Sequence, residues 1–399
     1  MYLTLAQKDL ARALSLVSPV VGNGQIQMPI LKYLLLRTEL DGLAVLAANE
    51  DTRIRARVKA SVQASDTLLL PAQTFSRLVG DLPTATITLM SPSPTDQTAL
   101  QLRGPQIKAN FKQGALPVSE FPQVQFLEEG EELVTLDCEL LKEIVEQVAF
   151  AASSNAARPV LEGLRVACQN GFATFLAADA FRLAIRTIPI PDQRVTAELL
   201  IPATVLRMLA RLLPSSGAVR LGRSRDGRQL LVQTREMDLS SRLLDGVYPD
   251  VRSLLALSAP TRVVLPTSAL TNAVHLMTSF ARENKHQLRC TIEPSSDTPS
   301  LLLEAEAPDL GTNEIRLTEG VTISGPTLSI LINHTYFAEA LATVPTPQVA
   351  LECLNARRPV TIKPVGPLDA RHIIMPLMLE STPAPTQVAP EATATSATR

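Results

Sequence analysis

Tryptophan is absent from the 399-residue sequence, and aromatic residues make up only 4% of it. Proteins that hold single-stranded nucleic acid without sequence preference stack the bases on aromatic side chains, and this composition offers few such platforms. An excess of positive charge is also missing, because 37 Lys and Arg residues face 39 Asp and Glu residues, for a formal net charge of −2. The chain is therefore not expected to hold nucleic acid by charge alone.

Cysteine is scarce, and long hydrophobic runs are missing. The four cysteines stand too far apart for a CxxC pair, a zinc knuckle or the disulfide framework of a small secreted domain, so we expect reduced, mostly buried thiols. They are Cys138, Cys168, Cys290 and Cys353. Lys8 and Asp9 interrupt the segment where a signal peptide needs an apolar core, and no run approaches the roughly 18 apolar residues of a membrane span. We therefore expect a cytoplasmic chain with no membrane partner.

Signatures of catalysis are missing too. No HExxH, GxSxG or GxxxxGKS/T motif occurs in the sequence. The histidines are scattered, and each is expected to be structural or exposed. They are His275, His286, His334 and His372. The sequence therefore predicts a protein that is not an enzyme and that needs no cofactor and no metal.

Internal repetition is the strongest signal that the sequence does contain. Apolar residues at i, i+5, i+9 and i+12 occupy residues 5–17, and the same pattern returns at 136–148 and 265–277. This spacing is typical of one face of an amphipathic helix, and Pro266 suits the first turn of the third copy. The sequence therefore predicts three equivalent helices.

A second set of helical segments is interleaved with the first. It occupies residues 70–83, 201–214 and 332–345, and each copy ends on a proline, which closes a helix. Copies within each set lie about 130 residues apart, and the second set follows the first by about half that distance. These intervals predict three domains, each built from two similar halves.

Strand hairpins are predicted between the helices. Apolar runs are separated by Asx-Gly pairs, which favour tight turns, at Asp41-Gly42, Asn170-Gly171 and Asp226-Gly227. Each half is thus a strand, a helix and several antiparallel strands, which predicts an α+β fold with two helices on sheets in each domain. The expected domains are residues 1–125, 130–255 and 260–380. Residues 381–399, rich in Pro, Ala and Thr, are expected to form a disordered tail.

Four stretches carry a resemblance to a known family. Residues 28–36, 177–186, 243–250 and 373–378 are similar to strings at the corresponding places of the bacterial sliding clamp, the beta subunit of the replicative DNA polymerase III. The resemblance covers residues 1 to about 380. It implies a DNA clamp fold, a head-to-tail homodimer that closes into a ring, and encirclement of duplex DNA without regard to sequence. The chain would be a non-catalytic processivity factor in DNA replication.

The resemblance also implies a partner site between the second and third domains. Its partners would be the replicative DNA polymerase, the clamp loader and other clients with short hydrophobic peptide motifs. Carried over position by position, the cleft consists of Leu161, Ala178, Ala180, Phe181, Arg182, Leu183, Pro249, Leu254, Pro359, Ile373, Met375, Pro376 and Leu377. An apolar groove with one arginine at its rim can bury a peptide's Leu or Phe and fix its orientation.

Two of these positions depart from the family. Phe181 stands where many members have His, and Ala180 where many have Gly, so the pocket is expected to be narrower and its peptide preference altered. Without the resemblance, the same residues would be interpreted as ordinary core and strand residues.

Basic residues on the predicted helices are candidates for DNA contact. They are Arg12, Arg77, Lys142, Arg207, Arg211 and Arg282. The helical segments carry no net positive charge, and uncharged residues stand where family members usually place basic ones, at Gln73, Thr74, Ala203 and Thr204. Tight DNA contact is therefore not expected. A closed ring is retained by topology, however, so weak phosphate contact that permits sliding is sufficient.

The resemblance further assigns the dimer contact. Phe111 would lie on one side of it, with Leu276 and Phe280 as candidates on the other. Two functions stay open at this point. One is a DNA-encircling processivity factor; the other is a clamp-fold protein-binding scaffold, or a specialised repair or plasmid clamp with weakened DNA contact.

Overall fold

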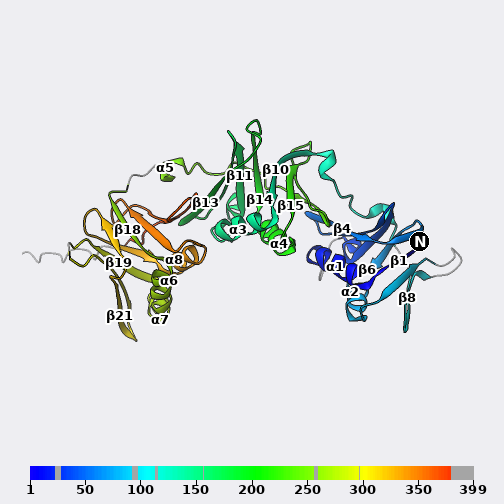
Figure 1. The fold of residues 1–399 in the computed structure, drawn as a ribbon, viewed down its shortest axis with the longest axis horizontal. Helices are drawn as coiled ribbons and strands as arrows, with labels where there is room; N and C mark the ends of the chain where they lie inside the picture. Colours follow the sequence, from blue (N-terminus) through cyan, green and yellow to red (C-terminus); the bar gives the residue numbers. More distant parts are fainter. Residues whose placement is uncertain are drawn as a thin grey trace, which may run out of the picture.

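Three similar units form an arch (Figure 1). The computed structural model describes residues 1–22, 28–91, 98–112, 116–155, 157–255, 259–295 and 297–378. The N-terminal unit lies at one end of the arch and the C-terminal unit at the other, and the helices of the central unit lie on the inner side beneath its strands. The tail expected over residues 381–399 lies outside the described residues.

Helices and strands follow a common order in the three units, with two differences: the second unit lacks a strand equivalent to β5 and β22, and the third has an additional helix, α7. The first unit contains β1 (Tyr2–Ala6), α1 (Gln7–Val17), β2 (Tyr33–Glu39), β3 (Gly42–Ala48), β4 (Thr52–Lys59), β5 (Ser61–Ala64), β6 (Thr67–Pro71), α2 (Ala72–Asp81), β7 (Thr86–Met90), β8 (Thr98–Gly104) and β9 (Ile107–Lys112). The second contains β10 (Glu131–Asp137), α3 (Cys138–Ala149), β11 (Gly163–Gln169), β12 (Phe172–Ala178), β13 (Arg182–Pro189), β14 (Ala197–Pro202), α4 (Ala203–Leu212), β15 (Ala218–Arg223), β16 (Gln229–Gln233) and β17 (Met237–Arg242). A short helix, α5 (Arg252–Leu255), follows it. The third contains β18 (Thr261–Pro266), α6 (Thr267–Leu276), α7 (Thr278–Glu283), β19 (Gln287–Glu293), β20 (Ser300–Ala307), β21 (Gly311–Leu317), β22 (Thr322–Ser324), β23 (Leu328–Asn333), α8 (His334–Ala342), β24 (Gln348–Cys353), β25 (Val360–Pro364) and β26 (Ala370–Ile374).

Each helix of the repeated pattern begins directly after a strand. Leu5 and Leu136, the first apolar positions of the pattern, lie in β1 and β10, and the helices begin two residues later. Asp137 ends β10 and caps α3, because its side chain accepts a hydrogen bond from the backbone N–H of Glu139 at 2.8 Å. The prediction that the whole pattern forms one helix face is thus wrong at its first position. Pro266 likewise precedes α6 rather than lying in its first turn.

The third unit has one helix more than the sequence pattern predicts. The helix α6 ends at Leu276, and α7 begins two residues later, so Met277 forms a break between them. The Met277 side chain is fully buried, and the Thr278 hydroxyl donates to the carbonyl of His275 at 2.6 Å. The extra helix went unpredicted because the repeated pattern ends at Met277; at the equivalent place the first unit has only a short 3-10 helix, Ser18–Val20.

The predicted hairpins form, but one turn is displaced by a residue: Glu39 pairs with Gly42, so Leu40 and Asp41, rather than Asp41 and Gly42, join β2 to β3. Asn170 and Gly171 have φ values of 53° and 77°, the positive values that a two-residue turn of type I′ needs at both central positions. This turn joins β11 to β12, with Gln169 opposite Phe172. Gly227, between β15 and β16, also has a positive φ, 72°.

Two of the four sheets cross the boundaries between units. In the eight-stranded sheet, with order β10-β15-β16-β17-β4-β3-β2-β6, strand β17 of the second unit pairs antiparallel with β4 of the first. In the nine-stranded sheet, with order β14-β11-β12-β13-β26-β25-β24-β18-β22, β13 pairs antiparallel with β26 of the third unit. The other sheets, β5-β1-β7-β8-β9 and β21-β20-β19-β23, lie in the first and third units. Among the described strands, β9 and β21 form free edges of these two sheets.

Two large hydrophobic clusters form most of the core. One hydrophobic cluster runs through the first and second units, and another fills the third. The cysteines are free and buried, as predicted, and burial raises the pKa of the Cys168 thiol. Within the described ranges, no helix combines the length and the hydropathy that crossing a bilayer requires.

Candidate partner-binding and DNA-facing sites

The deep cleft residues meet at the junction of the second and third units. Leu161 lies in the short 3-10 helix before β11, Ala178 ends β12 and Leu183 lies in β13. Ile373 of β26 is placed against them because it pairs with Leu183 across the unit boundary. These side chains are buried in one hydrophobic cluster, and Leu254 of α5 packs on it. The base of the predicted cleft is therefore a packed apolar layer.

The remaining cleft residues differ in exposure. Pro359 is buried, Pro376 and Leu377 are half-buried, and Ala180 and Pro249 are exposed.

Two large apolar side chains form the exposed part of the rim. Phe181 is 56% exposed and Met375 38%. The Met375 N–H donates to the Phe181 carbonyl at 2.8 Å, so the two residues are neighbours on the surface. Monomeric proteins seldom leave adjacent large apolar side chains uncovered without a functional reason.

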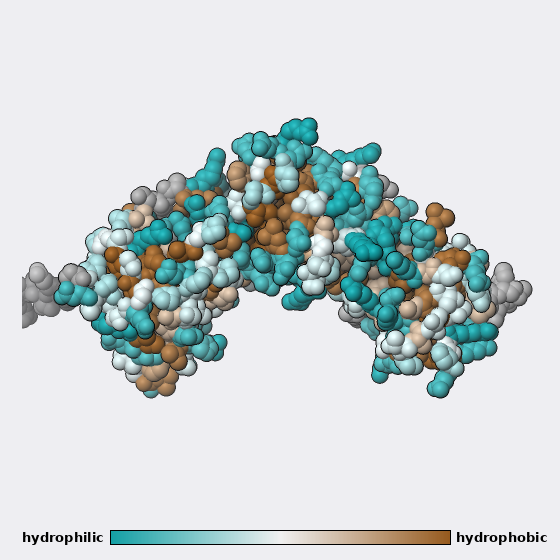
Figure 2. All heavy atoms as spheres, viewed as in Figure 1, coloured by the Kyte–Doolittle hydropathy of each residue, from teal (hydrophilic) through white to brown (hydrophobic). Residues whose placement is uncertain are grey.

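A hydrophobic area is visible on the central unit, around β11 and β14 (Figure 2). Half-buried Val160 and Leu244 pack against the buried cluster in this part of the molecule. Hydrophilic residues surround the area. Half-buried side chains at the edge of the cluster thus reach the surface of the described chain.

Arg182 is held within the protein rather than left free at the rim. Its Nε donates to Asp179 at 3.1 Å, its Nη2 donates to the carbonyl of Phe150 at 3.0 Å, and its Nη1 pairs with Glu339 of α8. The guanidinium also lies 4.5 Å from the ring centroid of Tyr336. The Arg182 side chain is 12% exposed, and its contacts with Glu339 and Tyr336 join β13 to α8.

Two residues at this junction were missed in the sequence. Tyr336 and Glu339 lie one turn apart on α8, and the Tyr336 ring stacks on Phe181 with centroids 6.5 Å apart. No local motif marks them. Their role depends on how α8 docks against the second unit, which the sequence pattern does not show.

The candidate DNA-facing cations fall into two groups. Arg77, Arg211 and Arg282 are exposed on α2, α4 and α7. Arg12 on α1 is 57% exposed but pairs with Glu236 at 2.7 Å, and Lys142 on α3 is half-buried.

Arg207 is the most restricted of these cations. Its guanidinium donates to the carbonyl of Ala149, the last residue of α3, and so ties α4 to α3. Burial lowers the pKa of Arg207, and the neighbouring Arg182 and Arg211 add to this effect. Arginine remains charged under ordinary conditions, but this side chain is already committed to an internal contact.

The residues assigned to the dimer contact lie at the two ends of the arch. Phe111, in β9, is only 9% exposed, and its ring meets Phe75 edge-to-face at 5.3 Å in the core of the first unit. Leu276, the last residue of α6, is 65% exposed, and Phe280 of α7 is half-buried. Only Leu276 is therefore an exposed anchor in the single chain.

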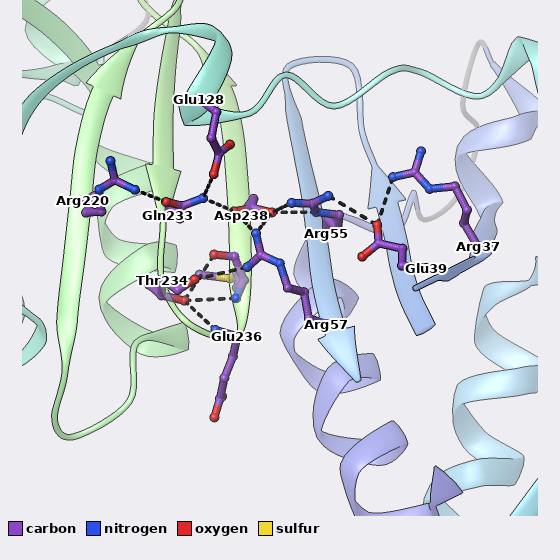
Figure 3. Close-up of polar contacts among 11 residues, drawn as sticks. Arg37, Glu39, Arg55, Arg57, Glu128, Arg220, Gln233, Thr234, Glu236 and Asp238 are labelled. Atoms are coloured by element: carbon purple, nitrogen blue, oxygen red, sulfur yellow. Dashed lines mark hydrogen bonds and ion pairs between the residues drawn. The ribbon is translucent and has the colours of Figure 1, made fainter. Parts of the chain in front are cut away.

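A polar network that sequence reasoning missed joins the first and second units (Figure 3). Asp238 of β17 accepts from the Nε of Arg55 and the Nη2 of Arg57, both at 2.6 Å and both from β4. Gln233 donates to the same carboxylate at 3.4 Å, and the Arg55 guanidinium lies 3.6 Å from the Phe126 ring centroid. The Asp238 side chain is 2% exposed, so its charge is balanced almost wholly by these arginines.

Comparison with known sequences identifies all three units. Family models of the DNA polymerase III beta subunit match residues 1–125 (N-terminal domain), 135–250 (central domain) and 252–378 (C-terminal domain). The chain is 26% identical to the beta sliding clamp of Synechococcus elongatus, over 96% of this chain and 100% of that protein. It is 24% identical to the beta sliding clamp of Bacillus subtilis, over 89% and 94% of the two chains.

Solved structures show the same fold. The sliding clamp of Bacillus subtilis superposes with a TM-score of 0.86 at 22% identity, covering 95% of this chain and 99% of that one. The beta subunit of Thermotoga maritima DNA polymerase III gives 0.82 at 21% identity, with coverage of 95% and 99%. Since the three family models account for nearly all of the described residues and the arch is shared with these structures, the chain belongs to the DNA polymerase III beta subunit family.

Proposed function

We propose that the protein is a DNA sliding clamp: a non-catalytic processivity factor that closes into a ring with a second copy and encircles duplex DNA during replication. The observation that carries this proposal is the use of the sheet edges. In each half-unit, the third strand after the helix is the outermost strand of that half-unit. Four of these strands pair across the unit boundaries, β4 with β17 and β13 with β26. The equivalent strands β9 and β21 lie at opposite ends of the arch.

Head-to-tail pairing of β9 with β21 of a second copy would repeat the junctions already present in the chain. It would join the five-stranded sheet of one copy to the four-stranded sheet of the other. The edges at β9 and β21, which sheet proteins otherwise have to protect, would then be covered. Because each copy offers both edges, two copies close the ring and leave neither strand unpaired.

Retention on DNA in this proposal comes from enclosure. The inner side of the arch carries helices, with exposed Arg211 available to phosphates. Arg12 and Arg207 already have partners in the protein, and exposed Arg77 lies 3.9 Å from Asp81. Few free cations suit a ring that must slide.

The experiment is retention on closed DNA. Protein loaded onto a nicked circular plasmid by a clamp loader should stay bound through a rise in salt and leave when the plasmid is linearised. Release from the circle at the salt that releases the protein from a short duplex would overturn the proposal, because charge would then hold the complex.

We further propose that the apolar surface at the second junction binds short hydrophobic peptides of the replicative polymerase, the clamp loader and other clients in the cytoplasm. The exposed Phe181 and Met375 beside a buried cluster support this assignment. Domain boundaries at residues 1–125, 130–255 and 260–380 are part of the same proposal.

A second candidate function is a specialised clamp or clamp-fold scaffold with weakened DNA contact. The observation in its favour is that Arg207 and Arg12, two of the candidate channel cations, are bound within the protein. Failure to load on DNA combined with intact peptide binding would favour this alternative.

A further inference from the structure

A cavity of about 910 Å³ lies at the junction of the first and second units. Its wall includes the turn between β3 and β4, the first half of α4 and the segment that follows β17. A neighbouring hollow of about 580 Å³ shares Glu50, Asp51 and Arg242 with it. The volume falls in the range of pockets that bind small ligands or single peptide side chains.

The internal repeat places this cavity where the partner cleft lies at the second junction. Ser241 of β17 pairs with Thr52 of β4, and Ile374 of β26 pairs with Arg182 of β13. Thr52 and Arg182 are both the first residues of their strands. The two junctions therefore share one register, and Thr52 is the counterpart of Arg182.

Counterparts of the cleft residues line the new cavity. In this register, Glu50 and Asp51 correspond to Ala180 and Phe181. The same comparison makes Leu31 the counterpart of Leu161, and Arg242, Leu243 and Leu244 the counterparts of Met375, Pro376 and Leu377. All six of the first-junction residues line the cavity: Leu31, Glu50, Asp51, Arg242, Leu243 and Leu244.

The two junctions differ in how their helices fill the space. At the second junction, Tyr336 of α8 stacks on Phe181, and Glu339 of α8 pairs with Arg182. The counterparts on α4 are Val205 and Met208, which also line the cavity.

Smaller side chains thus leave the first junction open. Val205 and Thr52 are smaller than the Tyr and Arg at the equivalent positions, and the Thr52 hydroxyl turns to Ser241, 2.9 Å away. Among the described residues, Val205 and Met208 of α4 therefore provide neither the ring stack nor the ion pair that Tyr336 and Glu339 form at the second junction.

The cavity combines an apolar wall with an acidic rim. Val205, Met208 and Leu243 supply the wall. Glu50 and Asp51 are exposed at the rim, and neither carboxylate forms an ion pair within the described part of the chain. Arg242, the arginine in the lining, pairs with Asp245 at 3.3 Å, so Glu50 and Asp51 leave the rim with excess negative charge. Such a rim attracts cationic groups, whereas the equivalent rim residues Ala180 and Phe181 carry no charge.

We propose that this cavity is a second peptide-binding site, which takes a segment of a partner protein that combines a Leu or Phe side chain with an adjacent Lys or Arg. The apolar side chain lies against Val205, Met208 and Leu243, and the cation pairs with Glu50 or Asp51. One chain would then offer two clefts of the same origin, one apolar and one acidic, to partners of different charge.

The probe is an amidated hexapeptide with Leu-Phe at its centre, two lysines on each side and a fluorophore on its N-terminus. It is added to the full-length protein, and binding is followed by fluorescence anisotropy and by the methyl NMR signals of the methionines. The expected result is a shift of the Met208 signal, with the Met375 signal unchanged. Replacing Glu50 and Asp51 by lysine, E50K with D51K, should weaken binding by about tenfold or more, because these exposed positions supply the paired charge.

Matched controls separate this site from the others. The charge-reversed protein should instead bind the peptide with glutamate in place of lysine, and a peptide with Gly-Gly in place of Leu-Phe should not bind wild-type protein. The variant Met375→Ala with Leu377→Ala should bind the lysine peptide as wild type does. Unchanged binding to the charge-reversed protein, a shift of Met375 in place of Met208, or equal binding of the Gly-Gly peptide would each overturn the proposal. None of these outcomes bears on ring closure or DNA retention, which are tested separately.

Discussion

Asp238 shows what a single carboxylate contributes to the joining of two units. It lies in β17 and is almost fully buried, with Arg55 and Arg57 of β4 as its ion-pair partners. Removing one partner of a buried ion pair leaves the other charge without compensation, which is strongly destabilising. The two ion pairs therefore stabilise the pairing of β17 with β4.

We expect Asp238→Asn to weaken the first junction. The free energy of opening the β4–β17 pairing should fall by about 3 kcal/mol, at the lower end for such pairs because Arg57 keeps some access to water. Amide hydrogen exchange of these two strands measures the change. The control is Asp245→Asn, which removes an exposed partner of Arg242 and should leave the exchange unaltered. Equal exchange in Asp238→Asn and wild type would contradict the role assigned to the network.

His372 predicts a pH dependence at the second junction. Burial lowers the pKa of this imidazole to about 4, against about 6.5 in an unfolded chain. Between these values the unfolded chain binds a proton that the folded one does not, so stability is full above pH 6.5 and falls as the pH drops toward 4. The expected loss between pH 7 and pH 5 is about 2 kcal/mol.

The variant His372→Gln tests this effect. Denaturant unfolding at pH 7 and pH 5 should show a smaller difference in the variant than in wild type. A residual slope is expected from His334, because burial lowers its pKa as well. The same pH difference in both proteins would show that His372 does not carry the dependence.

Individual elements follow the sequence more closely than the contacts between them. The Asn170-Gly171 turn forms as predicted because two residues suffice to set its backbone angles. The break at Met277 was missed because the repeated pattern ends at this residue and does not predict the helix that follows it.

Contacts between elements could be identified only from the structure. The pairing of Leu183 with Ile373 joins a strand in the middle of the second unit to the last strand of the third, and no local period encodes it. That Leu161, Leu183 and Ile373 lie together was nevertheless predictable through the family resemblance, whereas their role in partner binding stays a proposal. Tyr336 and Glu339 were not, since their roles arise from the docking of α8 against Phe181 and Arg182.

Met375 and Leu377, which follow β26, allow a test of the proposed partner cleft. Met375→Ala with Leu377→Ala removes two apolar side chains that are not fully buried, so the dimer and the melting temperature should survive. Binding of a hydrophobic polymerase-derived peptide, measured by fluorescence anisotropy, should weaken by about tenfold or more. A marked drop in melting temperature with unchanged peptide affinity of the folded protein would instead show that these residues belong to the core.

At the scale of the whole molecule, β9 and β21 are unpaired sheet edges at the two ends of the arch, within the described part of the chain. Strands β9 and β21 hold the same place in their half-units as the four strands that pair inside the chain. Ring closure by a second copy therefore reuses a contact that the chain already makes twice. Exposed Leu276 at the end of α6 and buried Phe111 in β9 offer variants that affect this closure in different ways.

We expect Leu276→Asp to prevent ring closure without unfolding the chain. The side chain is 65% exposed in the single chain, so a charge there costs little until a second copy covers it. Sedimentation equilibrium should show monomers at concentrations where wild type is a dimer, with the unfolding of the monomer unaltered.

Phe111→Ala should act differently, because it removes the ring that packs on Phe75 and destabilises the first unit by about 3–5 kcal/mol, loosening β9 as well. A stable wild-type monomer at micromolar concentration, or a Leu276→Asp dimer of wild-type affinity, would show that the ends of the arch do not meet as proposed.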